Sequence, residues 1–298
     1  MANNLDSPQI IVQAPVMENE GSFKNKDGLS ISTRTWTSQS EQPKALIFIC
    51  HGYGDHSKRY SKFLAQALVD EGFFVLSHDH VGHGKSEGER AQIDSLQKYV
   101  RDIFDHIDQI IPKYEGLPIY LFGHSMGGLI AVLAAQRRPT FFKGVVLSAP
   151  ALIVDPHKDN KCMRFLGKMV SWVAPSLQLL PAMDPNSMSR DPEQVKAYAE
   201  DPLVWHGGVK VGIGLAIAHA VDEVQASMES IKWPFLVLHG TADTLCLMEG
   251  SKQLERRAGS KDKTIKTYDG YYHDLLKEPK DDSTVILKDI IEWLNARM

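Results

Sequence analysis

The feature of this sequence that most constrains its fold is the alternation of short, continuous apolar runs with longer amphipathic stretches. Runs such as Ala45–Cys50 and Gly144–Ser148 are typical of strands buried on both faces, whereas Leu96–Ile110 places apolar side chains three or four residues apart, as on one helix face. Such strands, joined by helices, form a parallel sheet covered on both sides. The pattern predicts an α/β fold. The predicted strands cover residues 29–36, 45–50, 73–76, 119–122, 144–148, 235–238 and 264–268, and the predicted helices cover 58–70, 96–110, 126–138, 249–257 and 283–296.

One long interruption, residues 152–233, separates the fifth of these strands from the sixth. A crossover between parallel strands needs little more than a helix, and here about 80 residues intervene. They form either an ordinary helical subdomain or an apolar cap over the carboxyl end of the sheet, where open α/β sheets bind ligands. We favour the cap. The predicted organisation is a flexible arm over 1–28, a core over 29–151 and 234–298, and a cap over 152–233.

Composition narrows the classes of function. Thirty-three basic residues stand against 37 acidic ones, for a formal charge of −4, so we expect no nucleic-acid partner. Cys50, Cys162 and Cys246 include no CxxC pair and are typical of reduced thiols. The N-terminus lacks a signal-peptide pattern, and the most apolar long window, residues 203–221, carries Lys210 and two histidines. These features predict a cytoplasmic protein without a transmembrane segment.

A G-x-S-x-G pattern, formed by Gly123, Ser125 and Gly127, lies between a predicted strand and a predicted helix. In that context it is typical of a nucleophile elbow, a sharp strand-to-helix turn that exposes the serine above the sheet. The glycines leave room for the turn, and the helix N-terminus favours negative charge that develops beside it. We therefore predict that Ser125 is a nucleophile.

A serine hydroxyl needs a base within hydrogen-bond reach and an acid to orient that base. In folds with this elbow, the acid and then the histidine follow the serine along the chain. His273 lies in a loop between the last predicted strand and the last predicted helix, from which it can reach the elbow, so we predict it as the base. The other histidines after Ser125 lie in the interruption or at a strand end; they are His157, His206, His219 and His239.

The predicted acid is Asp243, which lies just past the carboxyl end of the strand over 235–238. Aspartates at strand ends are also common turn residues. The alternatives are Asp79, Asp184, Asp191 and Asp274.

The oxyanion of an acyl-transfer intermediate needs two preorganised N–H donors. One is expected from Met126, the residue after the nucleophile. The other is expected from the loop after the strand that ends at Cys50, where the Tyr53 amide is best placed.

A zinc site is the competing interpretation of this chemistry. His78, His80 and His83 have H-x-H-x-x-H spacing after a strand, and zinc bound there would activate water. Further ligands are not evident around them, and the segment also fits a glycine-rich structural turn. We therefore expect no metal and no cofactor.

Taken together, several segments resemble the monoacylglycerol lipase family, serine hydrolases of the α/β-hydrolase superfamily, from about residue 25 to the end, cap included. The resemblance implies the α/β-hydrolase fold, a mostly parallel central sheet flanked by helices with an inserted helical cap. It also implies that Ser125, Asp243 and His273 form the catalytic triad. The segments that carry it are residues 50–60, 78–90, 123–128, 201–203 and 241–246.

The resemblance also implies a substrate site. The glycerol hydroxyls would lie near Tyr198, with Asp55, Arg59 and His124 close by. Cys246 matches a cysteine beside the acid that thiol reagents attack in relatives. The chain departs from the family at Tyr53, where a small residue is usual, and at Trp205 and Gly212, which are cysteines in vertebrate relatives, so we expect a reshaped pocket and lower thiol sensitivity.

The predicted function is hydrolysis of monoacylglycerol to free fatty acid and glycerol through an acyl-enzyme. A lysophospholipase or acyltransferase of the same fold, and a non-catalytic lipid-binding protein, are the alternatives. By resemblance, the apolar cap would dock on a membrane surface and make the protein peripherally membrane-associated. Exposed apolar surface would also favour a homodimer.

Overall fold

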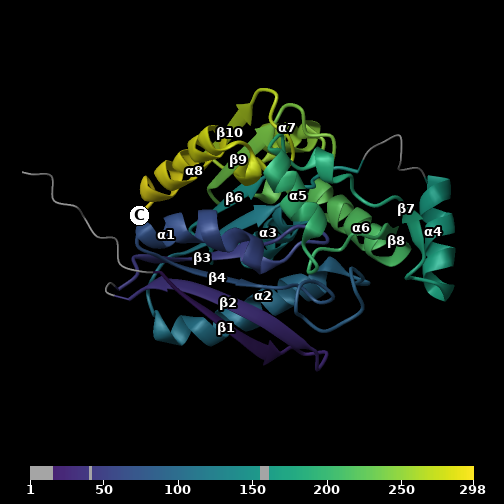
Figure 1. The fold of residues 1–298 in the computed structure, drawn as a ribbon, viewed down its shortest axis with the longest axis horizontal. Coiled ribbons are helices and arrows are strands. Elements are labelled where there is room, and N and C mark those ends of the chain that lie inside the picture. The colour runs from purple at the N-terminus through teal and green to yellow at the C-terminus, as the bar shows by residue number, and fades with distance from the viewer. Residues whose placement is uncertain (1–15, 40–41, 155–160) are drawn as a thin grey trace, which may run out of the picture.

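The computed structural model describes residues 16–39, 42–154 and 161–298, without the side chains of 161–166. Within these ranges, eight strands form one sheet in the order β1-β2-β4-β3-β5-β6-β9-β10 (Figure 1). The strands from β4 to β10 pair in parallel, and β1 and β2 add an antiparallel edge. The prediction of a mostly parallel sheet is confirmed. The strands are β1 (Val16–Lys24), β2 (Ser30–Ser38), β3 (Ala45–Cys50), β4 (Phe73–His78), β5 (Ile119–His124), β6 (Gly144–Ser148), β9 (Phe235–Gly240) and β10 (Lys263–Tyr268).

Helices cover both faces of the sheet. Along β3, Leu46 and Phe48 belong to the apolar cluster with α2, α3 and α6, whereas Ile47 and Ile49 belong to the cluster with α1 and α8. Successive strand side chains point to opposite faces, so an all-apolar strand is buried on both sides. The helices are α1 (Gln66–Asp70), α2 (Leu96–Ile110), α3 (Met126–Arg137), α4 (Lys161–Val173), α5 (Pro192–Glu200), α6 (Val211–Ser227), α7 (Met248–Arg257) and α8 (Lys280–Asn295).

Two predictions of local structure are wrong. The flexible arm over 1–28 fails from Val16 onward, because β1 pairs along its whole length with β2; residues 1–15 lie outside the described ranges. The helix over 58–70 is α-helical only in α1, and a 3₁₀ turn (Ser57–Tyr60) and a π turn (Ser61–Ala65) precede it. Such turns are frequent at functional sites, where they redirect side chains.

The chain between β6 and β9 carries α4, α5, α6 and a small two-stranded sheet of β7 (Gln178–Leu180) and β8 (Val209–Lys210). We call residues 152–233 the insertion. Its helix α6 packs on the core cluster, whereas α4 lies at one end of the molecule, beyond β7 and β8 (Figure 1). None of the helices in the described ranges is long and apolar enough to cross a membrane. Short 3₁₀ turns complete the chain at Ile111–Lys113, Pro185–Ser187, Met228–Ser230 and Leu275–Lys277.

Candidate active site

Ser125 lies on a strained turn between β5 and α3. Its φ of 56° and ψ of −122° are rare for a residue with a side chain. The turn depends on close backbone approach, because a Cβ atom at Gly127 would collide with the carbonyl oxygens of Cys50 and His51. The sequence pattern therefore has the sharp strand-to-helix geometry that a nucleophile elbow requires.

His273 and Asp243 form a buried pair. Asp243 Oδ2 lies 2.8 Å from His273 Nδ1, and Asp243 Oδ1 accepts the backbone N–H groups of Leu245 at 2.8 Å and Cys246 at 3.0 Å. Burial alone would raise the pKa of Asp243, but His273 and these hydrogen bonds outweigh burial and hold that pKa well below its usual range. Asp243 is therefore an ionised carboxylate that fixes one side of the imidazole ring.

His239 is a further neighbour of Asp243. Its Nε2 lies 3.2 Å from Asp243 Oδ2 and 2.9 Å from the Cys246 carbonyl, and its Nδ1 lies 2.8 Å from Ser251 Oγ. The sequence indicated only a structural histidine at a strand end. The structure shows that this structural position also holds the carboxylate that orients His273.

Ser125 and His273 border the same cavity. Its volume is about 20 Å³, room for about one water molecule. Ser125 Oγ lies 3.7 Å from Cys246 Sγ, and burial raises the pKa of that thiol above its ordinary value. Of the predicted site residues, Tyr53, Asp55, Arg59, His124, Ser125, Tyr198 and His273 border this cavity, together with Gly52, Met183, Met188 and Asp274, for which sequence reasoning gave no such place.

Two backbone amides are available beside Ser125. In the part of the chain that the structure describes, neither the Tyr53 N–H nor the Met126 N–H donates a hydrogen bond. Met126 begins α3, so its amide is one of the unpaired donors of a helix N-terminus. The Tyr53 loop lies against the elbow, since a Cβ atom at Gly52 would come 3.3 Å from Ser125 Cβ.

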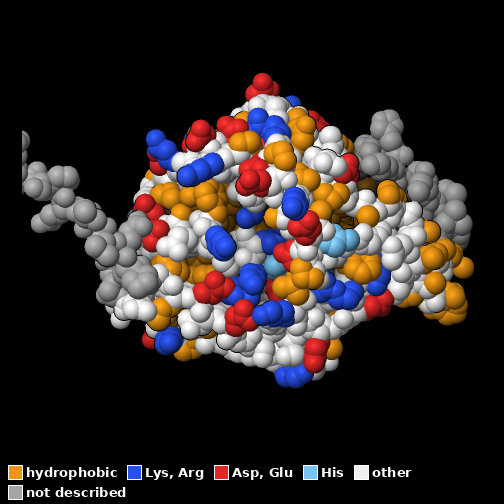
Figure 2. All heavy atoms as spheres, viewed as in Figure 1, with side chains coloured by type: hydrophobic (Ala, Val, Ile, Leu, Met, Phe, Trp, Pro, Cys, Tyr) orange, Lys and Arg blue, Asp and Glu red, His pale blue; other side chains and the backbone are white. Residues whose placement is uncertain are grey.

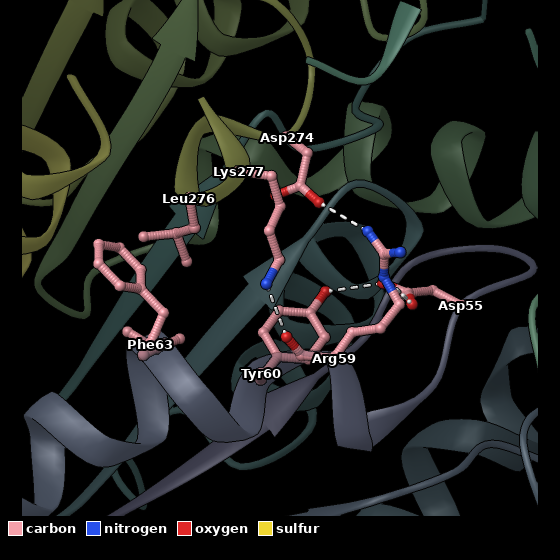
Figure 3. Close-up of a pocket in the computed structure, with 8 residues that line it drawn as sticks. Asp55, Arg59, Tyr60, Phe63, Asp274, Leu276 and Lys277 are labelled. Atoms are coloured by element: carbon pink, nitrogen blue, oxygen red, sulfur yellow. Dashed lines mark hydrogen bonds and ion pairs between the residues drawn. The ribbon is translucent and has the colours of Figure 1, made fainter. Parts of the chain in front are cut away.

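A group of polar side chains borders the cavity at Ser125 and also a second, outer cavity, which Figure 3 shows. Arg59 lies between two carboxylates, with Nε 2.9 Å from Asp55 Oδ1 and Nη2 3.3 Å from Asp274 Oδ2. The Tyr198 ring covers the guanidinium at 4.9 Å, and Tyr60 donates its hydroxyl to Asp55 at 3.2 Å. We call Asp55, Arg59, Tyr198 and Asp274 the polar wall.

The charges of this wall are fixed by their contacts. Burial would lower the pKa of Arg59, but Asp55 and Asp274 hold that pKa above its usual range. Burial would likewise raise the pKa of Asp55, but Arg59 outweighs burial and lowers it. Burial lowers the pKa of His124 to about 4, so this ring is neutral.

The alternative acids and bases are occupied elsewhere. His206 Nε2 lies 3.0 Å from the Asp201 carbonyl oxygen, His219 borders a separate cavity, and His157 lies outside the described residues. Asp79 accepts hydrogen bonds from Ser57. Asp184 and Asp191 cap the N-termini of a 3₁₀ turn and of α5.

The three histidines of the zinc interpretation are buried. Ring centroids of His78 and His80 lie 5.3 Å apart, and those of His80 and His83 lie 6.4 Å apart. Among the residues that the structure describes, no group of three or more His, Cys, Asp or Glu side chains could hold a metal ion. The zinc interpretation therefore has no ligand set there.

Two of the residues that depart from the family pattern, Tyr53 and Trp205, contact the same carbonyl of the insertion. The Tyr53 hydroxyl lies 3.5 Å from the Gly208 carbonyl, which also accepts the Trp205 indole N–H at 3.1 Å. A Cβ atom at Gly212 would collide with the Gln92 side chain. Cys246 and Cys50 are both buried free thiols.

Comparison with known proteins gives the family. The family described as serine aminopeptidase, S33, matches residues 41–280. The chain is 40% identical over 274 residues to a monoglyceride lipase of Rattus norvegicus, covering 92% of this chain and 89% of that protein. It is 32% identical over 280 residues to a monoacylglycerol lipase of Mycolicibacterium smegmatis, covering 94% and 98%. The crystal structure of Paleococcus ferrophilus monoacylglycerol lipase superposes with a TM-score of 0.77 at 35% identity, covering 91% of this chain and 99% of that one. The chain therefore belongs to the serine aminopeptidase S33 family and, within it, to the monoglyceride lipases.

Proposed function

We propose that this protein is a serine hydrolase that cleaves monoacylglycerol to free fatty acid and glycerol. The observation that carries the proposal is the buried pair of His273 Nδ1 and Asp243 Oδ2, 2.8 Å apart, on the cavity that Ser125 borders. The proposed nucleophile, acid and base follow β5, β9 and β10 in turn, so all three lie at the carboxyl ends of the strands. The relatives named monoglyceride and monoacylglycerol lipases support the substrate class.

The proposed reaction has two halves. Ser125 Oγ attacks the ester carbonyl while His273 accepts the hydroxyl proton at Nε2, and Asp243 stabilises the resulting imidazolium. The amides of Tyr53 and Met126 bind the oxyanion. His273 then protonates the departing glycerol oxygen. Water, activated by the same imidazole, releases the fatty acid from Ser125.

The polar wall is the proposed site for the alcohol of the substrate. Tyr198, Asp55 and Arg59 face the cavity with hydroxyl, carboxylate and guanidinium groups, and neutral His124 lies beside them. Such groups hydrogen-bond glycerol hydroxyls, which donate as well as accept. This chemistry favours monoacylglycerol over the alternative lysophospholipase and acyltransferase reactions, and the intact nucleophile, base and acid argue against a non-catalytic lipid-binding protein.

An exposed apolar face on the insertion is the proposed membrane contact. Trp172 is 86% exposed and Val173 is 76% exposed, and Met169, Leu179 and Leu180 are exposed beside them on α4 and β7. Hydrophobic side chains gather at that end of the molecule (Figure 2). Exposed apolar groups of this size mark interaction surfaces. We propose a cytoplasmic protein that binds membranes peripherally through this apolar face; a homodimer formed through it is the competing arrangement.

Membrane contact would also explain the small cavity. The cavity, with a volume of about 20 Å³, is smaller than an acyl chain, and we propose that the insertion shifts when substrate enters. α4 packs on α6 and lies apart from the eight-stranded sheet that carries Ser125 (Figure 1). Lipid bound to the apolar face would favour the open arrangement.

The proposal is tested with a fluorophosphonate probe and a substrate panel. We expect the probe to label the wild type and Ser171→Ala, a control serine on α4, and to leave Ser125→Ala unlabelled. On 1-oleoylglycerol and oleoyl lysophosphatidylcholine, we expect a preference for the first. A preference for lysophosphatidylcholine by about tenfold, or 1.4 kcal/mol, would overturn the substrate assignment. An unlabelled wild type would overturn the enzymatic one.

A further inference from the structure

Asp274 is the residue of the polar wall that lies next to the proposed base in the sequence. It follows the base His273 directly, and its backbone N–H donates to the Met188 carbonyl at 2.8 Å, which fixes its position against the insertion. The residue is only 8% exposed. It borders both the cavity at Ser125 and the outer cavity, which Figure 3 shows. Asp274 therefore borders the cavity in which an ester bound at Ser125 would lie.

The charges that border the Ser125 cavity on this side do not cancel. Asp55 and Asp274 are two carboxylates against the single guanidinium of Arg59. His124 is neutral, because burial lowers its pKa to about 4. Lys277 borders only the outer cavity, where it donates to the Arg59 carbonyl at 2.9 Å. The Lys277 ammonium acts on both carboxylates from the outer cavity. At the Ser125 cavity itself, a negatively charged leaving group would meet two carboxylates and one guanidinium.

Arg59 is already paired with two carboxylates. Its Nε lies 2.9 Å from Asp55 and its Nη2 lies 3.3 Å from Asp274, while the Tyr198 ring covers one face at 4.9 Å. A phosphate that took the place of either carboxylate at these two nitrogens would leave that carboxylate buried without its partner. Breaking a buried pair in this way is strongly unfavourable.

We propose that Asp274 is a specificity-determining residue that restricts the leaving group to uncharged alcohols and excludes esters whose alcohol carries a phosphate. This inference rests on the proposed function and deepens it. Glycerol hydroxyls can donate hydrogen bonds to the Asp274 carboxylate, whereas a phosphate, which has only acceptors when ionised, would face it as a like charge.

The test compares two substrates that share one acyl chain. Values of kcat/KM for 1-oleoylglycerol and for 1-oleoyl lysophosphatidate are measured in mixed detergent micelles of one composition, with wild type and Asp274→Asn. The ratio of the two values is the readout, because any general effect on His273 cancels in it. Asp70→Asn is the matched control: it removes the same charge from an exposed residue of α1, at the opposite edge of the sheet.

We expect wild type to prefer 1-oleoylglycerol by about 100-fold or more, and Asp274→Asn to reduce that preference by about tenfold, the size of a like-charge interaction across a few ångströms at a partly buried site. Asp70→Asn is expected to keep the wild-type ratio. A wild type that hydrolyses both esters at similar rates overturns the inference. So does an unchanged ratio in Asp274→Asn, or in Asp274→Ser if the asparagine variant does not fold. A wild type inactive on both substrates overturns the proposed function itself, and the inference falls with it.

Discussion

The two halves of the insertion meet the rest of the protein in opposite ways. The half from α5 to α6 is tied to the core: Trp205 N–H donates to the Gly54 carbonyl at 2.8 Å, and the buried Lys210 ammonium donates to Glu89 at 2.9 Å and to the Arg90 carbonyl at 2.7 Å. The half formed by α4 and β7 instead exposes large apolar side chains, led by Trp172. We call these the anchored half and the exposed half.

The two halves of the insertion are therefore suited to different roles. The anchored half supplies Tyr198 to the polar wall, so its position has to be as well defined as that of the core residues it contacts. The exposed half contacts α6 and β8 on one side and presents a surface suited to lipid on the other. Under the proposed function, one inserted segment would both position the alcohol of a substrate and contact the membrane that contains the substrate.

The largest expected effect is a loss of kcat from a substitution at Asp243, which lies in the core and outside both halves of the insertion. Asp243→Asn keeps the shape of the acid but leaves His273 without the carboxylate that orients it, so we expect kcat to fall by about 10⁴-fold. The loss should be equal on 1-oleoylglycerol in vesicles and on a short, water-soluble ester. Asp184→Asn, which changes an aspartate of the insertion, should leave kcat within about twofold. A loss confined to vesicles would place Asp243 in membrane binding instead.

The next largest effect is expected on hydrolysis in vesicles, when exposed apolar side chains are removed from α4. The double variant Trp172→Ser and Val173→Ser should lower hydrolysis of 1-oleoylglycerol in phosphatidylcholine vesicles by about tenfold or more, since each large apolar side chain contributes about 1.5–3 kcal/mol when buried. Hydrolysis of the soluble ester should be unchanged. Val285→Ser, which removes an exposed apolar residue of α8, is the control and should have no effect on either substrate.

Sedimentation of the same double variant tests the competing homodimer. If the apolar face binds lipid, wild type and variant sediment as monomers and only wild type co-sediments with vesicles. A wild-type dimer that the variant converts to monomer would assign the face to a second copy of the chain.

Substitutions in the anchored half should lower the free energy of unfolding more than substitutions in the exposed half. Lys210→Met leaves the Arg90 carbonyl buried without its donor, so we expect the free energy of unfolding to fall by about 1–3 kcal/mol. Lys168→Met, on exposed α4, should change it by less than about 0.5 kcal/mol. Urea unfolding measures both. Equal losses would mean that α4 is held as firmly as the anchored half.

The smallest expected effect is a loss of folding stability at acidic pH. Burial lowers the pKa of His83, in the loop that carries Glu89 and Arg90, to about 3. The unfolded chain binds this proton below its ordinary pKa of about 6.5 and the folded chain does not, so stability falls as pH decreases from about 6.5 toward 3. Between pH 6.5 and 5.5, wild type should lose about 1 kcal/mol more than His83→Gln. Parallel pH curves would contradict this assignment.

Much of the sheet could be predicted from sequence because its strands are buried on both faces. β3 and β6 have the predicted bounds, since an all-apolar run between turn residues has few other arrangements. β1 could not be predicted. Its sequence is mostly polar and its side chains are mostly exposed, so hydrogen bonding to β2, rather than burial, gives it strand structure.

For the site, the sequence predicted residues that motifs and chain order single out, such as Ser125, but not those that only tertiary packing brings in. His239 contacts Asp243 because the turn after β9 folds back on the strand. Asp274 was considered only as an alternative acid, and its ion pair with Arg59 joins residues 215 positions apart. Its position beside the predicted base was the one available signal.

The most direct test of the account is a crystal structure with a covalent inhibitor that keeps both arms of the substrate, an alkyl phosphonate with a glyceryl ester and a p-nitrophenolate leaving group. We predict phosphorus bonded to Ser125 Oγ, and the phosphoryl oxygen about 2.7–3.1 Å from the amides of Tyr53 and Met126. The glyceryl arm should lie on the polar wall, and the alkyl chain should lead toward α4 and β7. Phosphorus on another residue, or a glyceryl arm beneath α4, would contradict the account.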